Sequence, residues 1–132
     1  MADLEDALRA RAVAHSGLNA LLGGRFYPNE LPQKPTLPAC AYLRVGTVPF
    51  HTGAGGSALR VGRVRFVVYG GTYDAAKDVV VQLRAAFHRW GGTVAGVTVQ
   101  QGFLDTEFDL GFDATTNQWV TSIDLRFWYL EP

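Results

Sequence analysis

The spacing of apolar residues along the chain predicts two helices that each bury one face. The first begins after Asp3, whose side chain can cap it, is interrupted at 16–17 and ends at the glycine pair 23–24. The second and clearer helix runs over 73–90 and ends at the glycine pair 91–92. The apolar positions are Leu4, Ala7, Leu8, Ala12, Leu18, Leu21 and Leu22 in the first helix, and Ala76, Val79, Val80, Leu83, Ala86, Phe87 and Trp90 in the second.

Alternation of apolar and polar residues predicts strands, which the helices separate into groups. We expect strands at 41–48, 63–69, 94–101, 103–110 and 119–129, with Gly96 as a bulge. The last is long for a strand, so it is expected to cross the centre of the sheet. This order predicts a single α+β domain over 1–132, with a mainly antiparallel or mixed sheet of about five strands and two main helices packed on it.

Two connecting segments carry no regular pattern. Residues 23–39, here called the proline hook, hold four prolines between positions 28 and 38. Proline excludes both helix and central strand, so we expect an extended connection there. Residues 49–59 start at Pro49 and are rich in glycine, which predicts a flexible loop between two strands.

Composition excludes several classes of protein. The chain has 132 residues, with 12 basic and 12 acidic side chains, so net charge steers it toward neither nucleic acid nor an anionic membrane. Cys40 stands alone and is expected to fill space in the core in a reducing compartment. The acidic start is unlike a signal peptide, and no apolar run approaches the roughly 18 residues of a membrane span. We expect a soluble cytoplasmic protein without membrane contact.

Catalytic patterns are lacking in the sequence. The histidines at 15, 51 and 88 have no metal-ligand spacing, and the glycine-rich segment lacks the lysine of a phosphate-binding loop. No serine lies in a nucleophile elbow, and Cys40 has no histidine that the sequence places beside it. We therefore expect no enzyme activity, no cofactor and no metal.

One acidic cluster leaves two interpretations open. Asp105, Glu107 and Asp109 are expected on one strand face, where carboxylates can bind a divalent cation or act as acid and base. Alternation alone also places polar residues there, and arginines can face them across strands or across a subunit boundary. The arginines in question are Arg63, Arg65 and Arg126. Charge pairing is the favoured interpretation.

The last strand has large aromatic rings on both faces, including Trp119 and Trp128. In one arrangement one face packs on the helices and the other meets a partner, since a large apolar patch left in water often marks an interaction site. In the other arrangement the chain covers both faces itself, with one helix on each side. Association is slightly favoured.

The order of the segments resembles that of the tail completion, or tail terminator, proteins of long-tailed bacteriophages and gene transfer particles. The resemblance spans nearly the whole chain and departs from expectation at 39–41, where bulkier residues are usual. It is carried by Leu4-Glu5-Asp6-Ala7-Leu8-Arg9, Gly24-Arg25-Phe26-Tyr27-Pro28, Leu37-Pro38 before Tyr42-Leu43-Arg44-Val45, Val64-Arg65-Phe66-Val67-Val68-Tyr69, and Leu125-Arg126-Phe127-Trp128-Tyr129.

This resemblance implies a structural virion protein that is no enzyme. It implies a hexameric ring at the head-proximal end of the tail tube, which stops tube polymerisation and joins the tail to the head connector. The implied partners are further copies of the chain, the tail tube protein and the head–tail connector protein. The implied location is the head–tail junction of the virion tail, with assembly in the host cytoplasm.

Under this hypothesis the hook over 25–38 and the loop over 49–59 contact neighbouring subunits, the tube or the connector. Arginines at 60, 63 and 65 either line a lumen through which DNA passes, without specific recognition, or form a charge-paired interface, which is favoured. The predicted interface residues are Arg25, Phe26, Tyr27, Pro28, His51, Gly53, Gly55, Gly56, Arg60, Arg63, Arg65 and Trp128. Two alternatives stay open: a head-closure or connector subunit of the same particle, and a dimeric small-molecule-binding α+β domain.

Overall fold

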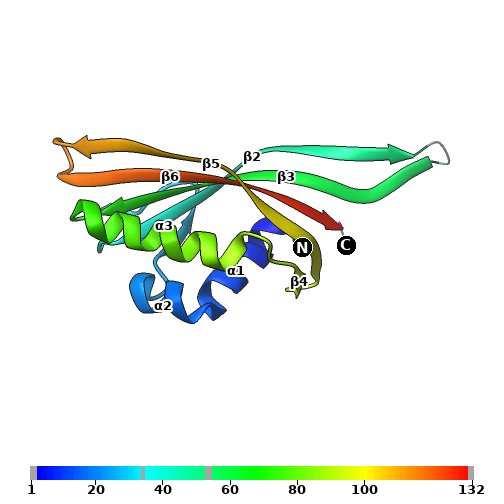
Figure 1. Ribbon diagram of the computed structural model, residues 1–132, viewed down its shortest axis with the longest axis horizontal. Helices are drawn as coiled ribbons and strands as arrows, with labels where there is room; N and C mark the ends of the chain where they lie inside the picture. Colours follow the sequence, from blue (N-terminus) through cyan, green and yellow to red (C-terminus); the bar gives the residue numbers. More distant parts are fainter. Residues whose placement is uncertain (1–2, 34, 53–54, 131–132) are drawn as a thin grey trace.

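All the helices lie on one face of a six-stranded sheet in a computed structural model that describes residues 3–33, 35–52 and 55–130 (Figure 1). The opposite face of the sheet carries no helix from these residues. The arrangement with one helix on each face is therefore wrong. One face packs on the helices, as the other arrangement predicts, and a partner on the opposite face stays a prediction.

The first predicted helix is two short helices, α1 (Leu4–Ala14) and α2 (Ser16–Leu22). Asp3 and Asp6 form a reciprocal capping box at the start of α1, as the sequence predicts for Asp3. Gly23, in the left-handed region with φ 55°, ends α2. The break that the sequence indicates is centred on His15, which ends one helix and caps the next.

His15 gives the stability of the protein a specific pH dependence. Its Nδ1 accepts a hydrogen bond from Leu18 N–H at 3.2 Å, which requires a neutral ring. Burial, and after it the nearby charge of Arg11, lower the pKa of His15 in the folded state. The unfolded chain therefore binds the proton more readily, so this stability is complete above roughly pH 6.5 and is lost as the pH falls through the folded pKa.

We expect the free energy of unfolding in urea to be lower at pH 5.5 than at pH 8, by at most about 1 kcal/mol, the full size of one helix cap. His15→Asn keeps a capping oxygen and cannot titrate, so it should lose less over the same range. Equal pH dependence in both proteins would contradict this role of His15.

The third helix, α3 (Tyr73–Phe87), buries the predicted stripe but ends three residues early. Arg89 adopts φ 60°, which breaks the helical path. The backbone then joins the sheet: Arg89 N–H donates to Gly102 O at 2.7 Å, and Gly102 N–H donates to Trp90 O at 2.8 Å. Hydrogen bonding to the sheet edge thus replaces the last predicted turn.

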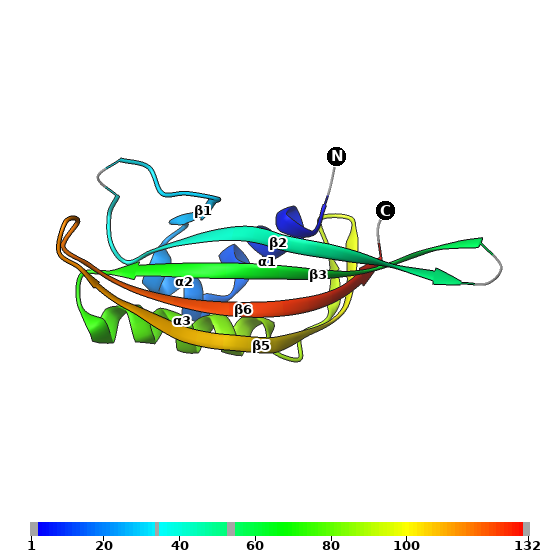
Figure 2. The same cartoon turned by 90° about the horizontal axis from the view of Figure 1, so that it is seen from above.

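Six strands form one mixed sheet, which confirms the α+β prediction. The spatial order is β1-β2-β3-β6-β5-β4, with β1 parallel to β2 and the remaining pairs antiparallel (Figure 2). The last strand, β6, lies inside the sheet as predicted. The strands are β1 (Phe26–Pro28), β2 (Ala39–Thr52), β3 (Gly55–Gly70), β4 (Gly92–Val94), β5 (Val97–Asp113) and β6 (Gln118–Leu130).

The proline hook is only partly without regular structure. Its residues Phe26–Pro28 form β1, an edge strand that pairs with Cys40–Tyr42. Proline is tolerated at an edge because the sheet needs no donor on the outer side. The hook therefore contains a short strand near its start, followed by irregular backbone at 29–33 and 35–38.

Residues 49–59 are mostly paired strand, which corrects the prediction of a loop there. Pro49 lies opposite Arg60, and Thr52 lies opposite Gly55, in a long β2–β3 hairpin. Cross-strand pairing outweighs the poor strand propensity of glycine here. Pairing of β3 with β6 stops at Leu59, so the hairpin extends beyond the rest of the sheet (Figures 1 and 2).

The segment 94–113 also differs from the prediction. Ala95 and Gly96 both have positive φ, at 52° and 81°, and they form the tight turn between β4 and β5 instead of a bulge. The strand β5 is continuous, with register shifts after Val99, Leu104 and Asp109. Each shift inverts the alternation of side chains, which is why the sequence resembles two shorter strands.

The core lies between the helices and the inner face of the sheet. Its largest fully buried rings are Phe26, Phe66, Phe87 and Phe127. Cys40 is fully buried among apolar neighbours, as predicted, and burial raises the pKa of its thiol well above the usual range. That thiol is therefore unreactive.

Candidate interaction surface

The helix-free face of the sheet, here called the open face, carries a cluster of charged and aromatic side chains. Three neighbouring strands, β3, β6 and β5, supply the side chains, which the cross-strand register places on the same side. Those used below are Val61, Arg63, Arg65, Phe103, Asp105, Phe108, Asp124, Arg126 and Trp128.

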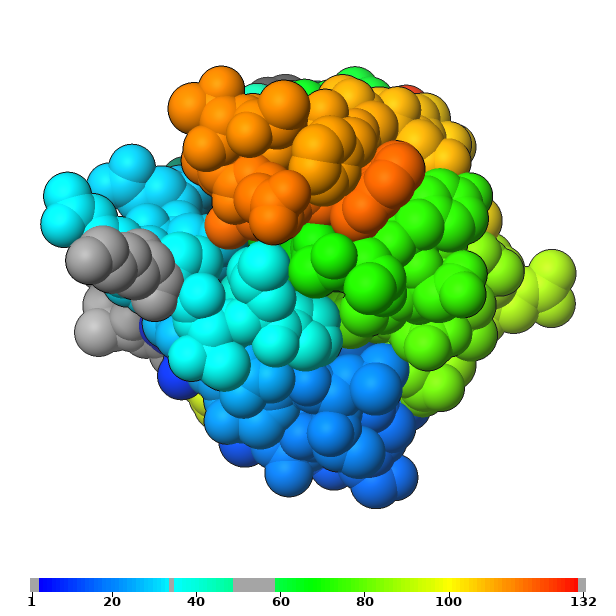
Figure 3. Space-filling view, turned by 90° about the vertical axis from the view of Figure 1, so that its left-hand side faces the viewer, coloured from blue at the N-terminus to red at the C-terminus, as the bar shows by residue number. Residues whose placement is uncertain are grey.

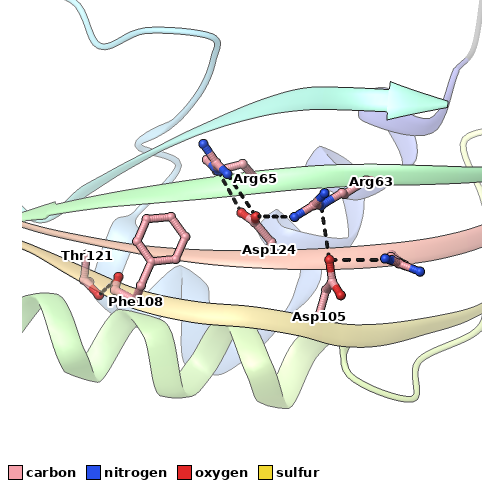
Figure 4. Close-up of polar contacts among 7 residues, drawn as sticks. Arg63, Arg65, Asp105, Phe108, Thr121 and Asp124 are labelled. Atoms are coloured by element: carbon pink, nitrogen blue, oxygen red, sulfur yellow. Dashed lines mark hydrogen bonds and ion pairs between the residues drawn. The ribbon is translucent and has the colours of Figure 1, made fainter.

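Asp124 is the centre of the charge network on this face. Only 1% of its surface is exposed, although no helix covers it. Arg65 grips both carboxylate oxygens, at 2.9 and 3.1 Å, and Arg63 approaches at 3.4 Å (Figure 4). The guanidinium of Arg65 also lies 5.3 Å from the ring centre of Phe108. These arginines and their neighbours in the sheet bury the carboxylate.

Asp105 extends the network to the next arginine. Its Oδ2 lies 3.1 Å from Arg63 Nε and 3.5 Å from Arg126 Nε (Figure 4). The bulge after Leu104 turns Asp105 toward the open face. Three guanidinium groups therefore share two carboxylates, which leaves this cluster with an excess positive charge.

The predicted common face of Asp105, Glu107 and Asp109 is wrong. The same bulge sends the last two carboxylates to the helix side of the sheet, where Glu107 bonds Arg84 at 2.8 Å and Asp109 bonds Lys77 at 2.5 Å. The hydrogen bond from Lys77 is the main cause that lowers the pKa of Asp109.

All three acids form charge pairs, as the favoured interpretation expects, but only Asp105 pairs with predicted arginines, Arg63 and Arg126. Arg65 pairs with a different carboxylate, that of Asp124. Within 3–33, 35–52 and 55–130, no group of three or more His, Cys, Asp or Glu side chains is arranged to hold a metal ion.

Trp128 lies half-buried on the open face. Its ring meets Phe103 edge to face, with centres 5.3 Å apart, and Phe103 remains 38% exposed. Aromatic and arginine side chains are enriched at protein interfaces. An interface role for Trp128 stays a prediction.

The predicted interface residues of the hook differ in how accessible their side chains are. Arg25 is anchored, because it donates to Pro38 O at 2.9 Å and to Leu21 O at 3.0 Å. Phe26 is 1% exposed and belongs to the core, which corrects its predicted place at an interface. The accessible residues are Tyr27, half-buried, and Pro28, exposed.

The predicted residues of the 49–59 segment lie along the projecting hairpin. His51, Gly55 and Gly56 are in its strands by their backbones. Gly53 lies outside the described residues. Arg60 stands at the base of the hairpin, is half-buried, and donates to Leu59 O at 3.1 Å.

Sequence reasoning missed Asp124, the most buried charged residue of this surface. The available signal was a carboxylate in the middle of the central strand, where alternation places it beside arginines of β3. It also missed Phe103 and Phe108, whose outward position depends on the register of β5.

These features define a class of small α+β proteins. Helices cover one face of the sheet, and a hairpin extends the sheet at one end. Residues 6–130 match the family model described as "Tail completion protein gp17", and the chain belongs to that family. It is a structural component of a virion tail, as the resemblance in the sequence implied.

A solved structure has the same fold. It is a chain of the "Virion of native gene transfer agent (GTA) particle", with a TM-score of 0.79 and 12% sequence identity, over 97% of this chain and 95% of that chain. At this identity the likeness shows the fold alone. The search of curated proteins found no match. None of the helices in the described part of the chain has the length and apolar character needed to cross a membrane.

Proposed function

We propose that the protein forms a hexameric ring at the head-proximal end of the tail tube, ends tube polymerisation there and joins the tail to the head connector. Its role is structural and non-catalytic. The single observation that carries the proposal is the open face, an uncovered sheet surface with aromatic and arginine side chains, in a member of a tail completion family.

The architecture of the open face suits repeated contacts between copies. A ring needs two different surfaces on each subunit that fit each other and close by rotation. The hairpin extends past the body of the sheet, and among the described residues β2 has a strand partner on its outer side only at Cys40–Tyr42. Its long free edge offers backbone donors and acceptors to a neighbour.

The ion pairs of the open-face arginines favour a place at an interface over a place in a lumen through which DNA passes. Arg63 and Arg65 are both engaged by Asp124, and Arg63 also by Asp105. Paired arginines contribute less to binding of phosphate than free ones, because each contact must replace an existing ion pair. If DNA passes through the ring, we propose that it does so without specific recognition by Arg63 or Arg65.

The proposal is tested by mass measurement with light scattering, with and without tail tubes of the same particle. We expect monomers at low concentration and rings when tubes are added. Trp128→Ala should weaken ring formation while the variant stays folded. Trp90→Ala removes a similar ring on the helix side and should lower stability without weakening association.

Two other results would contradict the proposal in different ways, and a third would correct the role of Trp128. A compact dimer whose mass does not change when tubes are added would favour a small-molecule-binding domain. Rings that bind the head connector but do not bind tubes would favour a head-closure subunit. Loss of the folded monomer in Trp128→Ala alone would place Trp128 in the core.

A further inference from the structure

We infer that copies of this chain contact one another head to tail, with the tip of the β5–β6 hairpin of one copy seated in a groove on the open face of the next. This inference rests on the proposed ring and names the two surfaces that would form it. The partner is a second copy of this chain.

The groove lies where the β2–β3 hairpin leaves the sheet. It is an open hollow of about 400 Å³. Its apolar part is formed by Val45, Val48 and Val61, and its cationic rim by Arg63 and Arg126. Val45 is 46% and Val48 63% exposed, so a partner seated here would bury apolar surface that the single subunit leaves in water.

The rim of this groove carries more positive than negative charge. Arg63 and Arg126 share Asp105, and the second carboxylate of the cluster, Asp124, is held mainly by Arg65. The excess positive charge therefore lies at the edge of an apolar hollow. A segment that fits must combine apolar side chains with a free carboxylate.

The tip of the β5–β6 hairpin has that combination. Leu110 is 59% and Phe112 46% exposed, and the next residue, Asp113, is also exposed. Phe112 is held in place by Trp119, with ring centres 5.1 Å apart. The carboxylate of Asp113 accepts from Thr115 N–H at 3.0 Å, and no ion pair engages it among the described residues.

The two surfaces lie toward opposite ends of the long axis. The tip stands at the end where β5 turns into β6, which Figure 3 views head on. The residues that line the groove in β2 and β3 lie next to the hairpin that projects at the other end (Figure 1). One copy cannot fill its own groove with its own tip. Two different patches that fit each other generate a heterologous contact, which closes into a ring when the rotation permits.

Charge reversal tests the pairing in trans. In sedimentation with tail tubes, Asp113→Arg should give at least tenfold fewer rings than wild type. Arg126→Glu should show the same loss, because each variant places like charges at the contact. An equimolar mixture should recover rings, since in an alternating ring every tip then meets a rim residue of opposite charge. Asp113→Asn keeps the turn, and Asp78→Arg reverses a charge elsewhere on the exposed surface; both should assemble better than the reversals.

Cross-linking provides a second measurement that does not depend on charge. The double variant Val48→Cys with Phe112→Cys should give a ladder of oxidised oligomers, whereas a mixture of the two single variants should stop at dimers. Buried Cys40 does not interfere.

The outcomes separate this inference from the proposed function. Rings of normal stability from both reversals, or a mixture that fails to recover, would overturn the pairing and leave the ring standing. Normal rings that no longer bind tubes would assign the groove to the tube protein and overturn the pairing as well. Wild-type protein that stays monomeric with tubes would overturn the proposed function and the inference together.

Discussion

Replacing Phe87 by alanine should lower the free energy of unfolding by about 3–5 kcal/mol, a large share of the total stability of a domain of this size. Phe87 ends α3 and is fully buried. Its ring centre lies 5.2 Å from that of Phe66 and 5.7 Å from that of Phe127, so it joins the helix to both central strands. Removing the ring opens a cavity at the meeting point of these elements.

The surroundings of Phe87 cannot close that cavity cheaply. A Cβ placed on Gly102 would lie 2.5 Å from Phe87 O, so the helix end and β5 are already in close contact at the backbone. Since the walls are tied by the bonds between 89–90 and Gly102, little collapse is available. The loss should therefore lie within the range given above and not below it.

Urea unfolding followed by circular dichroism measures this loss. Val81→Ala is the matched control, because Val81 lies on the same helix and is 50% exposed. We expect the control to change stability by less than about 0.5 kcal/mol. A loss below about 1 kcal/mol in Phe87→Ala would mean that α3 is not anchored to the sheet in this way.

The sequence predicted the parts of the fold that depend on local periodicity. The stripe of α3, including Phe87, follows from apolar residues at helical spacing. The inner face of β3, with Val64, Phe66 and Val68, follows from alternation. Each pattern reports which side of an element meets the core, and that information is present in the neighbouring residues alone.

The parts that the sequence did not predict depend on partners distant in the chain. β1 is a strand because it pairs with β2, and three residues carry no signal of their own. The prediction of a loop over 49–59 used the conformational freedom of glycine, which cross-strand hydrogen bonds can restrict. The bulge that turns Asp105 away from Glu107 and Asp109 is visible only in the register with β6.

On the candidate surface, too, the features that depend on local pattern were predicted, and those that depend on distant strand pairing were not. Arg63 and Arg65 were predicted to pair with carboxylates, and both do. Which acids they meet was not predictable, because Asp124 reaches them through pairing of β3 with β6. Phe26 was assigned to an interface for its place in the hook, but it stacks on Tyr42 in the core, with ring centres 4.4 Å apart.

Shortening the β2–β3 hairpin should abolish capping of tail tubes while the monomer keeps its stability. In the variant, residues 51–56 are replaced by Asn-Gly, which favours a tight two-residue turn. Every β3 residue that pairs with β6, from Leu59 onward, is retained. The pairs lost are those of the projecting part, and the pairing of β3 with β6 is kept, so the free energy of unfolding should change by less than about 1 kcal/mol.

Tail length in assembled particles and binding of the variant to purified tubes measure the effect. We expect overlong or unterminated tubes, because the hairpin reaches beyond the body of the subunit and its loss removes contacts that the rest of the sheet cannot replace (Figure 2). A second shortened variant, with residues 114–117 replaced by Asn-Gly, alters the opposite end of the subunit and serves as a comparison. Under the head-to-tail pairing inferred above, it should weaken ring closure, but its single subunits should still bind tubes, whereas those of the 51–56 variant should not. Normal tail length in the 51–56 variant would remove the hairpin from the capping mechanism and leave the open face as its sole proposed basis.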